Sequence, residues 1–264
     1  MIKNFLLSIL IALAVTGPAQ AGVVGKEITY RAGELEMKGY IAYDETLTAK
    51  RPGVIVVHEW WGHNAYVRKR AELLAAAGYV AMAVDMYGNG RQATHPDEAG
   101  KFAAEVRNNL PEARKRFLTA LEVLKADPMT DPGKLAAIGY CFGGGVALQM
   151  ARDGVELKGV VSFHGSLESS EPAKPGKIKA EILVFNGGAD QLVSPESIHA
   201  FVKEMTSAEA DFTFHSLPGA KHSFTNPDAN RLAAEFKMPL AYQEKGDKES
   251  WRDTLSFFNR IFSE

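Results

Sequence analysis

Apolar and polar positions along the chain follow two periods, one typical of strands and one typical of helices. Residues 53–58 (GVIVVH) form a continuous apolar run, as in a strand buried on both faces. In the next segment apolar residues recur at helical spacing over residues 67–75, with Asn64 placed to cap the helix and Gly78 to end it. This alternation predicts an α/β fold in which helices cover both faces of a mostly parallel sheet.

The same alternation continues along the chain. Further strands are expected in short apolar or β-branched runs, at residues 27–31, 37–43, 80–84, 135–139, 160–163, 182–185 and 212–217. Further helices are expected at 102–106, 111–124 and 143–151, with a last one capped by Asp247. Residues 88–100 are polar and rich in glycine, which predicts a surface loop. No linker rich in proline or serine interrupts this order, so residues 22–264 are expected to form a single domain.

Residues 1–21 differ from the rest of the chain. Lys3 is their only charge, residues 5–15 are almost entirely apolar, and small residues follow at Ala19-Gln20-Ala21. A short apolar run that ends in small residues is typical of a cleaved secretory signal peptide. We therefore expect residues 1–21 to be removed and the mature protein to be secreted or periplasmic, without membrane attachment. An uncleaved membrane anchor is the alternative.

Charge and composition exclude several classes of function. The chain has 264 residues, with 30 Lys and Arg against 32 Asp and Glu, a formal net charge of −2 and 46% hydrophobic residues. This balance does not suit a protein that grips nucleic acid. The single cysteine rules out an internal disulfide, and a chain of this length buries a sizeable core without one. We expect a monomer that acts on a small molecule.

The single cysteine, Cys141, lies in the segment 139–144 (GYCFGG), between an expected strand and an expected helix. The pattern is that of a nucleophile elbow, in which the nucleophile occupies a sharp turn and glycines two positions away avoid clashes. The turn would expose the thiol at a helix N-terminus, whose partial positive charge favours the thiolate. A lone cysteine is otherwise most often a small buried apolar residue, but the flanking glycines favour the nucleophile.

Two residues further along the chain are candidate partners of this nucleophile. Asp190 follows the strand expected at 182–185 and His222 follows the last strand, so the order is nucleophile, acid, histidine. Taken singly, Asp190 could be a turn residue and His222 a surface histidine. Because all three follow expected strands in the order of a catalytic triad, we expect His222 to accept the thiol proton and later protonate the leaving group. Asp190 would orient the imidazole.

The loop at residues 58–64 (HEWWGHN) supplies further candidates. The backbone N–H groups of Trp60 and Phe142 are expected to stabilise a tetrahedral oxyanion. Glu59 is expected to point toward the same crevice, where it could accept or position the thiol proton. The alternative is a loop carboxylate paired with a nearby Arg or Lys. The spacing of the two histidines does not match the zinc motif H-E-x-x-H, so no metal site is expected.

Together these motifs resemble those of the dienelactone hydrolase family of α/β-hydrolases. The matching segments are H-E-x-x-G at 58–62, D-x-Y at 85–87, G-x-C-x-G-G at 139–144, G-x-x-D at 187–190 and H-x-F at 222–224, with a similar tail at 241–251. The resemblance covers nearly all of the chain after residue 21. It implies an α/β-hydrolase fold and a triad of Cys141, Asp190 and His222, with Glu59 assisting the thiol. It also implies hydrolysis of an ester or lactone without a metal or organic cofactor.

The chain departs from the founding members of this family where those carry arginines that grip a substrate carboxylate. At the matching places this sequence has Asn89, with Arg91 nearby, and Asn226. An amide cannot form the charged bidentate contact of an arginine. We therefore expect a less anionic ester or lactone, bound near these residues and against aromatic side chains that could equally belong to the core, namely Trp60, Trp61, Tyr87 and Phe142.

Two functions other than hydrolysis remain open. An exposed thiolate is readily oxidised, so the protein could respond to peroxide, although it lacks a second, resolving cysteine. The chain could also be a hydrolase-like scaffold that binds a ligand without turnover, because a fold by itself does not establish activity.

Cleavage of the expected signal peptide is directly measurable. When the full chain is expressed in a bacterium that exports proteins, N-terminal sequencing of the exported protein should begin at Gly22, because Ala21 ends the cleavage pattern. Exported protein that still begins at Met1 would contradict cleavage and favour the uncleaved anchor.

Overall fold

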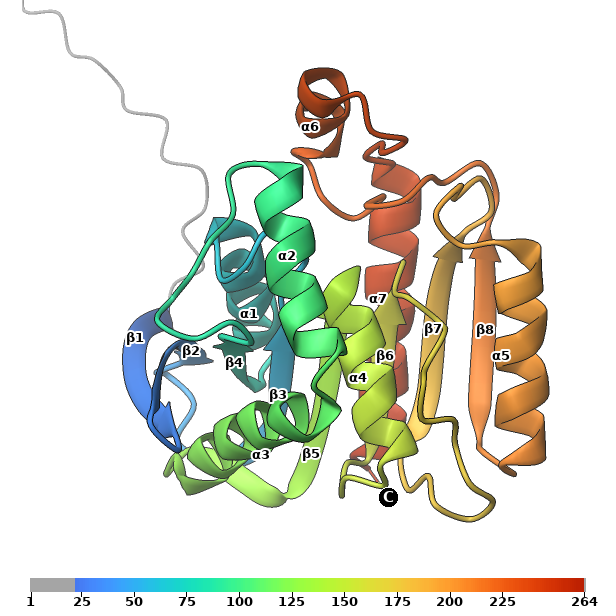
Figure 1. Ribbon diagram of the computed structural model, residues 1–264. Coiled ribbons are helices and arrows are strands. Elements are labelled where there is room, and N and C mark those ends of the chain that lie inside the picture. The colour runs from blue at the N-terminus through green and yellow to red at the C-terminus, as the bar shows by residue number, and fades with distance from the viewer. Residues whose placement is uncertain (1–21, 264) are drawn as a thin grey trace, which may run out of the picture.

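The computed structural model describes residues 22–263, which form an eight-stranded sheet between two layers of helices (Figure 1). The expected signal peptide, residues 1–21, lies outside the described residues. Over the described range, no helix combines the length and the apolar character needed to cross a membrane. The strands are β1 (Val23–Ala32), β2 (Leu35–Asp44), β3 (Arg51–Val57), β4 (Val80–Val84), β5 (Thr130–Tyr140), β6 (Gly159–Phe163), β7 (Glu181–Gly187) and β8 (Phe212–Leu217).

The strands lie in the order β1-β2-β4-β3-β5-β6-β7-β8 across the sheet. β1 and β2 pair antiparallel around a turn at Gly33, whose φ of 65° is easily adopted by glycine. β2 also pairs antiparallel with β4, and the remaining neighbours from β4 to β8 are parallel. The expectation of a mostly parallel sheet is therefore confirmed.

Helices cover both faces of this sheet, as the alternation of patterns predicts (Figure 1). Buried residues of α2, α3, α4 and α5 share one apolar cluster, and those of α1 and α7 share another on the opposite face. The short α6 packs instead against Trp61. The helices are α1 (Ala65–Ala76), α2 (Pro96–Arg107), α3 (Leu110–Ala126), α4 (Phe142–Arg152), α5 (Pro195–Ser207), α6 (Ala229–Phe236) and α7 (Glu244–Ile261).

The register of the central strands brings their C-terminal ends to one edge of the sheet. Val57 at the end of β3 pairs with Gly139 of β5, and Tyr140 of β5 pairs with Phe163 of β6. The loop at residues 58–64 directly follows β3, and Cys141 directly follows β5, so the loop and the cysteine both lie at this edge of the sheet. Polar residues that follow parallel strands are brought together in this way in many α/β enzymes.

The prediction of a surface loop at residues 88–100 is wrong for its last part, because helix α2 begins at Pro96. Proline suits the first turn of a helix, and the side chain of His95 accepts a hydrogen bond from the N–H of Asp97. Asp97 and Glu98 also complement the positive end of the helix dipole. Helices α5 and α6 lie where the sequence pattern predicts none.

The last helix also differs from the expectation, since α7 begins at Glu244 and is not capped by Asp247. Asp247 lies in the first turn, and its Oδ1 accepts a hydrogen bond of 2.6 Å from the buried guanidinium of Arg70 in α1. Arg70 also donates to the carbonyl oxygen of Thr225. The buried Arg70 therefore joins α1 to α7 through an ion pair and to the loop at residues 222–228 through a hydrogen bond.

Candidate active site

Cys141 lies at the turn from β5 into α4, in a backbone conformation that residues other than glycine rarely adopt. Its φ is 52° and its ψ −116°, and its side chain is partly exposed. Such conformations cost on the order of 1–3 kcal/mol and persist where neighbouring structure holds them. The N–H of Cys141 donates to the carbonyl oxygen of Phe163 at 3.0 Å, and its own carbonyl accepts from Gly144 at 3.0 Å. The turn has the strained geometry of a nucleophile elbow.

Two glycines beside Cys141 let α4 begin in contact with β3 and β5. A Cβ at Gly139 would lie 2.0 Å from the carbonyl oxygen of Gly143, and a Cβ at Gly143 would lie 2.4 Å from that of Val57. These atoms belong to the backbone and cannot rotate away. The glycines of the sequence pattern are therefore required by the close approach of three backbone segments.

The two backbone N–H groups expected to stabilise an oxyanion have no hydrogen-bond partner among the described residues. Cys141 is the N-cap residue of α4, and no side chain caps this helix. Among residues 22–263, neither the N–H of Phe142 nor that of Trp60 donates to another residue. The uncapped helix end carries partial positive charge beside the sulfur of Cys141, and the two N–H groups are available to an oxyanion.

His222 and Asp190 meet at the same edge of the sheet. Nδ1 of His222 lies 2.8 Å from Oδ2 of Asp190, whose side chain is fully buried. The other oxygen, Oδ1, accepts a hydrogen bond of 2.8 Å from the N–H of Leu192. With both oxygens bonded, the carboxylate is fixed and sets the orientation and tautomer of the imidazole.

The opposite ring nitrogen of His222, Nε2, is buried and forms no well-aligned hydrogen bond with any described residue. The Cys141 sulfur is nevertheless close enough for its charge and a weak hydrogen bond to act on the ring. Burial disfavours the charged ring, but the charge of Cys141 and the hydrogen bond with Asp190 outweigh it and raise the pKa of His222 to about 10. The ring therefore holds its proton at neutral pH.

Glu59 lies at this edge as expected, but its partners differ from both sequence expectations. Its Oε1 accepts a hydrogen bond of 3.1 Å from the hydroxyl of Ser223, and its Oε2 accepts one of 2.6 Å from the amide of Asn226. Burial raises the pKa of Glu59, although these hydrogen bonds and the charge of His222 oppose the rise. The carboxylate thus bonds to the loop that carries His222, rather than to the thiol or to an Arg or Lys.

Thr225 fixes the same loop from its other side. Its Oγ1 lies 2.6 Å from the hydroxyl of Tyr66 and 2.8 Å from Nε2 of His164. His164 is fully buried, and its ring packs edge-on against that of His222 with centroids 5.1 Å apart. Burial, assisted by the charge of His222, holds the pKa of His164 well below its usual value. A neutral ring therefore supports the imidazole of His222.

Tyr87 of the D-x-Y motif does not offer a surface to substrate. It is fully buried and donates its hydroxyl to the carbonyl oxygen of Trp60 at 2.9 Å. Its ring packs against Phe142, with centroids 5.4 Å apart. The buried carboxylate of Asp85 in the same motif accepts hydrogen bonds from the N–H groups of Tyr87, Gly88 and Gly90. This motif therefore supports the loop that carries the Trp60 N–H.

The polar residues expected to bind substrate have other partners or lie in a turn. Asn226 donates its amide to Glu59. Arg91 forms an ion pair of 2.8 Å with Glu105. Asn89 is exposed and has a φ of 56°, in the left-handed region that asparagine tolerates in turns. The conformations of these three residues are thus accounted for by contacts within the protein and by a turn, with no need of a bound ligand.

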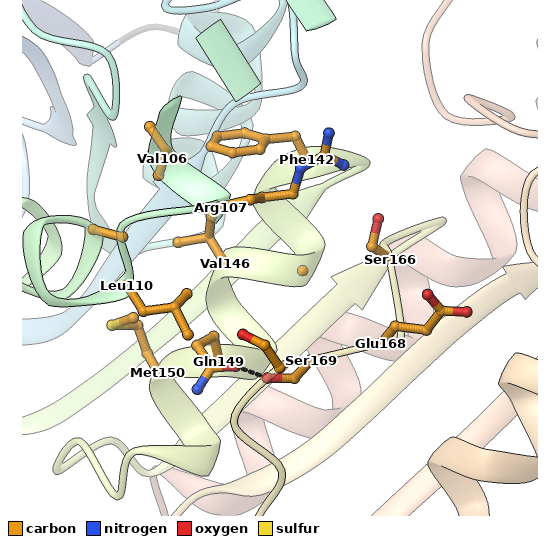
Figure 2. Close-up of a pocket in the computed structure, with 13 residues that line it drawn as sticks. Val106, Arg107, Leu110, Phe142, Val146, Gln149, Met150, Ser166, Glu168 and Ser169 are labelled. Carbon is orange, nitrogen blue, oxygen red and sulfur yellow. Dashed lines mark hydrogen bonds between the residues drawn. The ribbon is translucent and has the colours of Figure 1, made fainter. Parts of the chain in front are cut away.

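Two cavities flank the edge where these residues meet. One, of about 370 Å³, runs along α4 and is lined by Phe142 and by Arg107 of α2 (Figure 2). The other, of about 500 Å³, is lined by Trp61, by Asn226 and by residues of α6. Cys141 lines neither cavity, but Phe142 is its neighbour in the chain. The expected contacts of Phe142 and Trp61 with substrate are therefore compatible with their positions.

The two histidines of the 58–64 loop are buried and bonded to the backbone. Nδ1 of His58 lies 2.5 Å from the carbonyl oxygen of Glu59, and Nε2 accepts from the N–H of Met86 at 3.2 Å. Burial lowers the pKa of His58 to about 4. Nε2 of His63 lies 3.1 Å from the carbonyl oxygen of Ala83. Over residues 22–263, no three His, Cys, Asp or Glu side chains are grouped so that they could hold a metal ion.

Sequence reasoning did not identify the residues that support this site. Ser223 and Thr225 directly follow His222 in the H-x-F segment, so the sequence marks their loop, but it does not reveal their partners. Arg70 lies on α1, and nothing in its helical pattern indicates that it reaches the carbonyl oxygen of Thr225. These contacts join segments that are distant in the chain.

Comparison with known families gives one match over most of the chain. Residues 37–262 match the family model described as "Dienelactone hydrolase family". The matched range contains the turn at Cys141 as well as Glu59, Asp190 and His222.

Individual relatives agree with this match. The chain is 27% identical to a protein of Aquifex aeolicus provisionally named carboxymethylenebutenolidase, over 89% of this chain and 98% of that one. It is 36% identical over 159 residues to an uncharacterised protein of Caenorhabditis elegans, covering 57% of this chain and 94% of the other. Among solved structures, a dienelactone hydrolase-like promiscuous phosphotriesterase, P91, from metagenomic libraries is 32% identical. It superposes with a TM-score of 0.82 over 91% of this chain and 99% of that chain.

The crowding at Gly143 predicts a large cost for a single methyl group. Gly143→Ala should lower the free energy of unfolding by roughly 2–4 kcal/mol, because the new Cβ meets the backbone of β3. Gly100→Ala, in α2 with no atom within 4 Å of the new Cβ, is the matched control and should raise stability by about 0.5–1 kcal/mol. Urea unfolding measures both; equal effects of the two substitutions would contradict the packing argument.

The raised pKa of His222 predicts an unusual titration. NMR of the histidine ring nitrogens should show His222 protonated at neutral pH, with loss of the proton near pH 10. Cys141→Ala should shift this midpoint downward, because the charge of Cys141 contributes to the raised pKa. A wild-type midpoint near the ordinary value of 6.5, or one that does not move in the variant, would contradict the coupling.

Proposed function

The chain belongs to the dienelactone hydrolase family, and on this premise we propose that it hydrolyses carboxylic esters or lactones with Cys141 as the nucleophile. The observation that carries the proposal is the strained turn at Cys141, a partly exposed residue that adjoins the uncapped end of α4 and the His222–Asp190 pair. The names of relatives as carboxymethylenebutenolidases support this reaction class.

In the first half of the proposed reaction, the Cys141 thiolate attacks the carbonyl carbon of the substrate. A C–S bond forms, and the carbonyl electron pair moves to the oxygen, which the N–H groups of Phe142 and Trp60 stabilise. When this intermediate collapses, the C–O bond to the alcohol breaks. The His222 imidazolium gives its proton to the departing alkoxide, which leaves an acyl-cysteine and a neutral ring.

In the second half, water adds to the acyl-cysteine. Neutral His222 takes a proton from the attacking water, the C–S bond breaks, and the sulfur leaves as thiolate. The acid product departs, and the imidazolium–thiolate pair is restored. Asp190 keeps its hydrogen bond to Nδ1 throughout and stabilises the charged ring.

Glu59 acts in this proposal by holding the His222 loop and by its charge. Its two oxygens bind Ser223 and Asn226, which follow His222 in the chain. Its buried carboxylate lies close enough to His222 for their charges to interact. Both effects favour the imidazolium, and neither requires Glu59 to take the thiol proton directly.

We also propose that the protein works outside the cytoplasm, as a monomer. The support for export is the composition of residues 1–21, an apolar run followed by small residues. The support for a monomer is that the described residues bury an apolar cluster on each face of the sheet within one chain.

Hydrolysis of p-nitrophenyl esters with short acyl chains tests the proposal. Cys141→Ala and His222→Ala should each lower kcat/KM by roughly a thousandfold or more, because nucleophile and general base act as a unit. His199→Ala, an exposed histidine on α5, is the matched control and should leave hydrolysis unchanged. Mass spectrometry of briefly reacted wild type should find the acyl group on Cys141.

Three results would contradict the mechanism or the function. Undiminished hydrolysis by Cys141→Ala would exclude the thiol as nucleophile. A mass increase at Cys141 after peroxide treatment, with no hydrolysis of any ester or lactone, would favour a redox role. Binding of esters without turnover would favour a non-catalytic scaffold.

A further inference from the structure

The cavity along α4 includes a neighbour of the proposed nucleophile, and the catalytic roles described above leave most of its lining without a function. Phe142, which lines the cavity, directly follows Cys141 in the chain. Apolar side chains form much of the rest, contributed by α2, α3 and α4, namely Val106, Leu110, Ala113, Val146 and Met150. If the N–H of Phe142 holds the carbonyl oxygen of a substrate, the acyl chain can continue into this apolar cavity.

Arg107, the last residue of α2, is a cation without a fixed partner on the wall of this cavity. It is exposed, and its guanidinium forms no hydrogen bond or ion pair with any residue of the 22–263 range. Arg91 and Arg114, on the same face of the sheet, pair instead with Glu105 at 2.8 Å and Asp153 at 2.6 Å. Figure 2 shows the Arg107 side chain among the residues that line the cavity.

Arg107 and Cys141 both act electrostatically on one buried side chain, that of Tyr87. The charge of Cys141 and the charge of Arg107 both act on the hydroxyl of Tyr87, the first raising its pKa and the second lowering it, while burial has the largest effect. Tyr87 in turn packs against Phe142. The sulfur and the guanidinium are therefore each near enough to Tyr87 for their charges to act on its hydroxyl.

The other polar groups of the cavity do not neutralise Arg107. The amide of Gln149 and the hydroxyl of Ser169 bond to each other, as the dashed line in Figure 2 shows. Glu168 is exposed, and the figure places its carboxylate away from the guanidinium of Arg107. An anion in the cavity is therefore attracted to the Arg107 end and repelled from the Glu168 end.

We propose that this cavity is the acyl subsite and that Arg107 selects acyl chains that end in a carboxylate. The substrate class is the monoester of a short aliphatic dicarboxylic acid, with its free carboxylate on the guanidinium and its methylene groups on the apolar wall. This inference rests on the proposed esterase function. It revises the sequence expectation of a less anionic substrate, because Arg107 supplies a cation that neither Asn89 nor Asn226 provides.

A pair of esters with acyl chains of equal length tests the subsite. The p-nitrophenyl monoester of glutaric acid carries a carboxylate where p-nitrophenyl pentanoate carries a methyl group. Wild type should prefer the glutarate ester, and Arg107→Gln should lower kcat/KM for it by about ten- to a hundredfold, mainly through KM, with the pentanoate ester unchanged. Added salt should raise KM for the glutarate ester in wild type and have less effect in the variant.

Lys101→Gln is the matched control, because it removes the same charge from an exposed position of α2 that does not line the cavity. It should leave the preference between the two esters unchanged. Equal losses for both esters in Arg107→Gln would show a merely structural role at the end of α2 and overturn the proposal. An unchanged preference in that variant, or a wild-type preference for pentanoate, would also overturn it.

A binding measurement separates this subsite from the esterase function itself. Calorimetry of Cys141→Ala with monomethyl glutarate should show saturable binding that is about ten- to a hundredfold weaker in the Cys141→Ala, Arg107→Gln double variant. Binding that depends on Arg107 without hydrolysis by wild type would support the subsite and contradict the esterase. Hydrolysis of the pentanoate ester without binding that depends on Arg107 would support the esterase function and contradict the subsite.

Discussion

The close approach of three backbone segments around Cys141 is the constraint on which the rest of the structure depends. The start of α4 touches the ends of β3 and β5, and Gly139 and Gly143 leave room for this because they have no Cβ. The approach requires the positive φ of Cys141 and places its sulfur at an uncapped helix end. It also sets the N–H of Phe142 next to Cys141, so the candidate nucleophile and the candidate oxyanion donor have one geometric origin.

Buried charges around the sulfur are stabilised by hydrogen bonds that fix their orientation. Asp190 accepts from His222 and from the backbone of Leu192, and Glu59 accepts from Ser223 and an amide. A buried carboxylate without such partners would be costly and would take up a proton. Because the oxygens of both carboxylates bond to fixed partners, their orientation beside His222 is set by the folded structure.

The sequence predicted the features that local patterns encode. Apolar periodicity gave the strands and most helices, and glycine spacing around Cys141 gave the turn, because both follow from neighbouring residues. The start of α2 at Pro96 was hidden by its polar composition. Asp247 has the residue type and position of a helix cap, yet it pairs with Arg70 across the molecule, and helical periodicity does not reveal such a contact.

The sequence by itself therefore determined the fold class, and it indicated Cys141 as the candidate nucleophile and the order of its two candidate partners along the chain. Only the tertiary structure decided which side chains meet at the site. Glu59 bonds to Asn226 across 167 positions of sequence, and Arg107 reaches the cavity beside Phe142 from the end of another helix. The physical reason is that such contacts depend on loop conformations and on the packing of helices across the sheet, which the spacing of residues along one element does not encode.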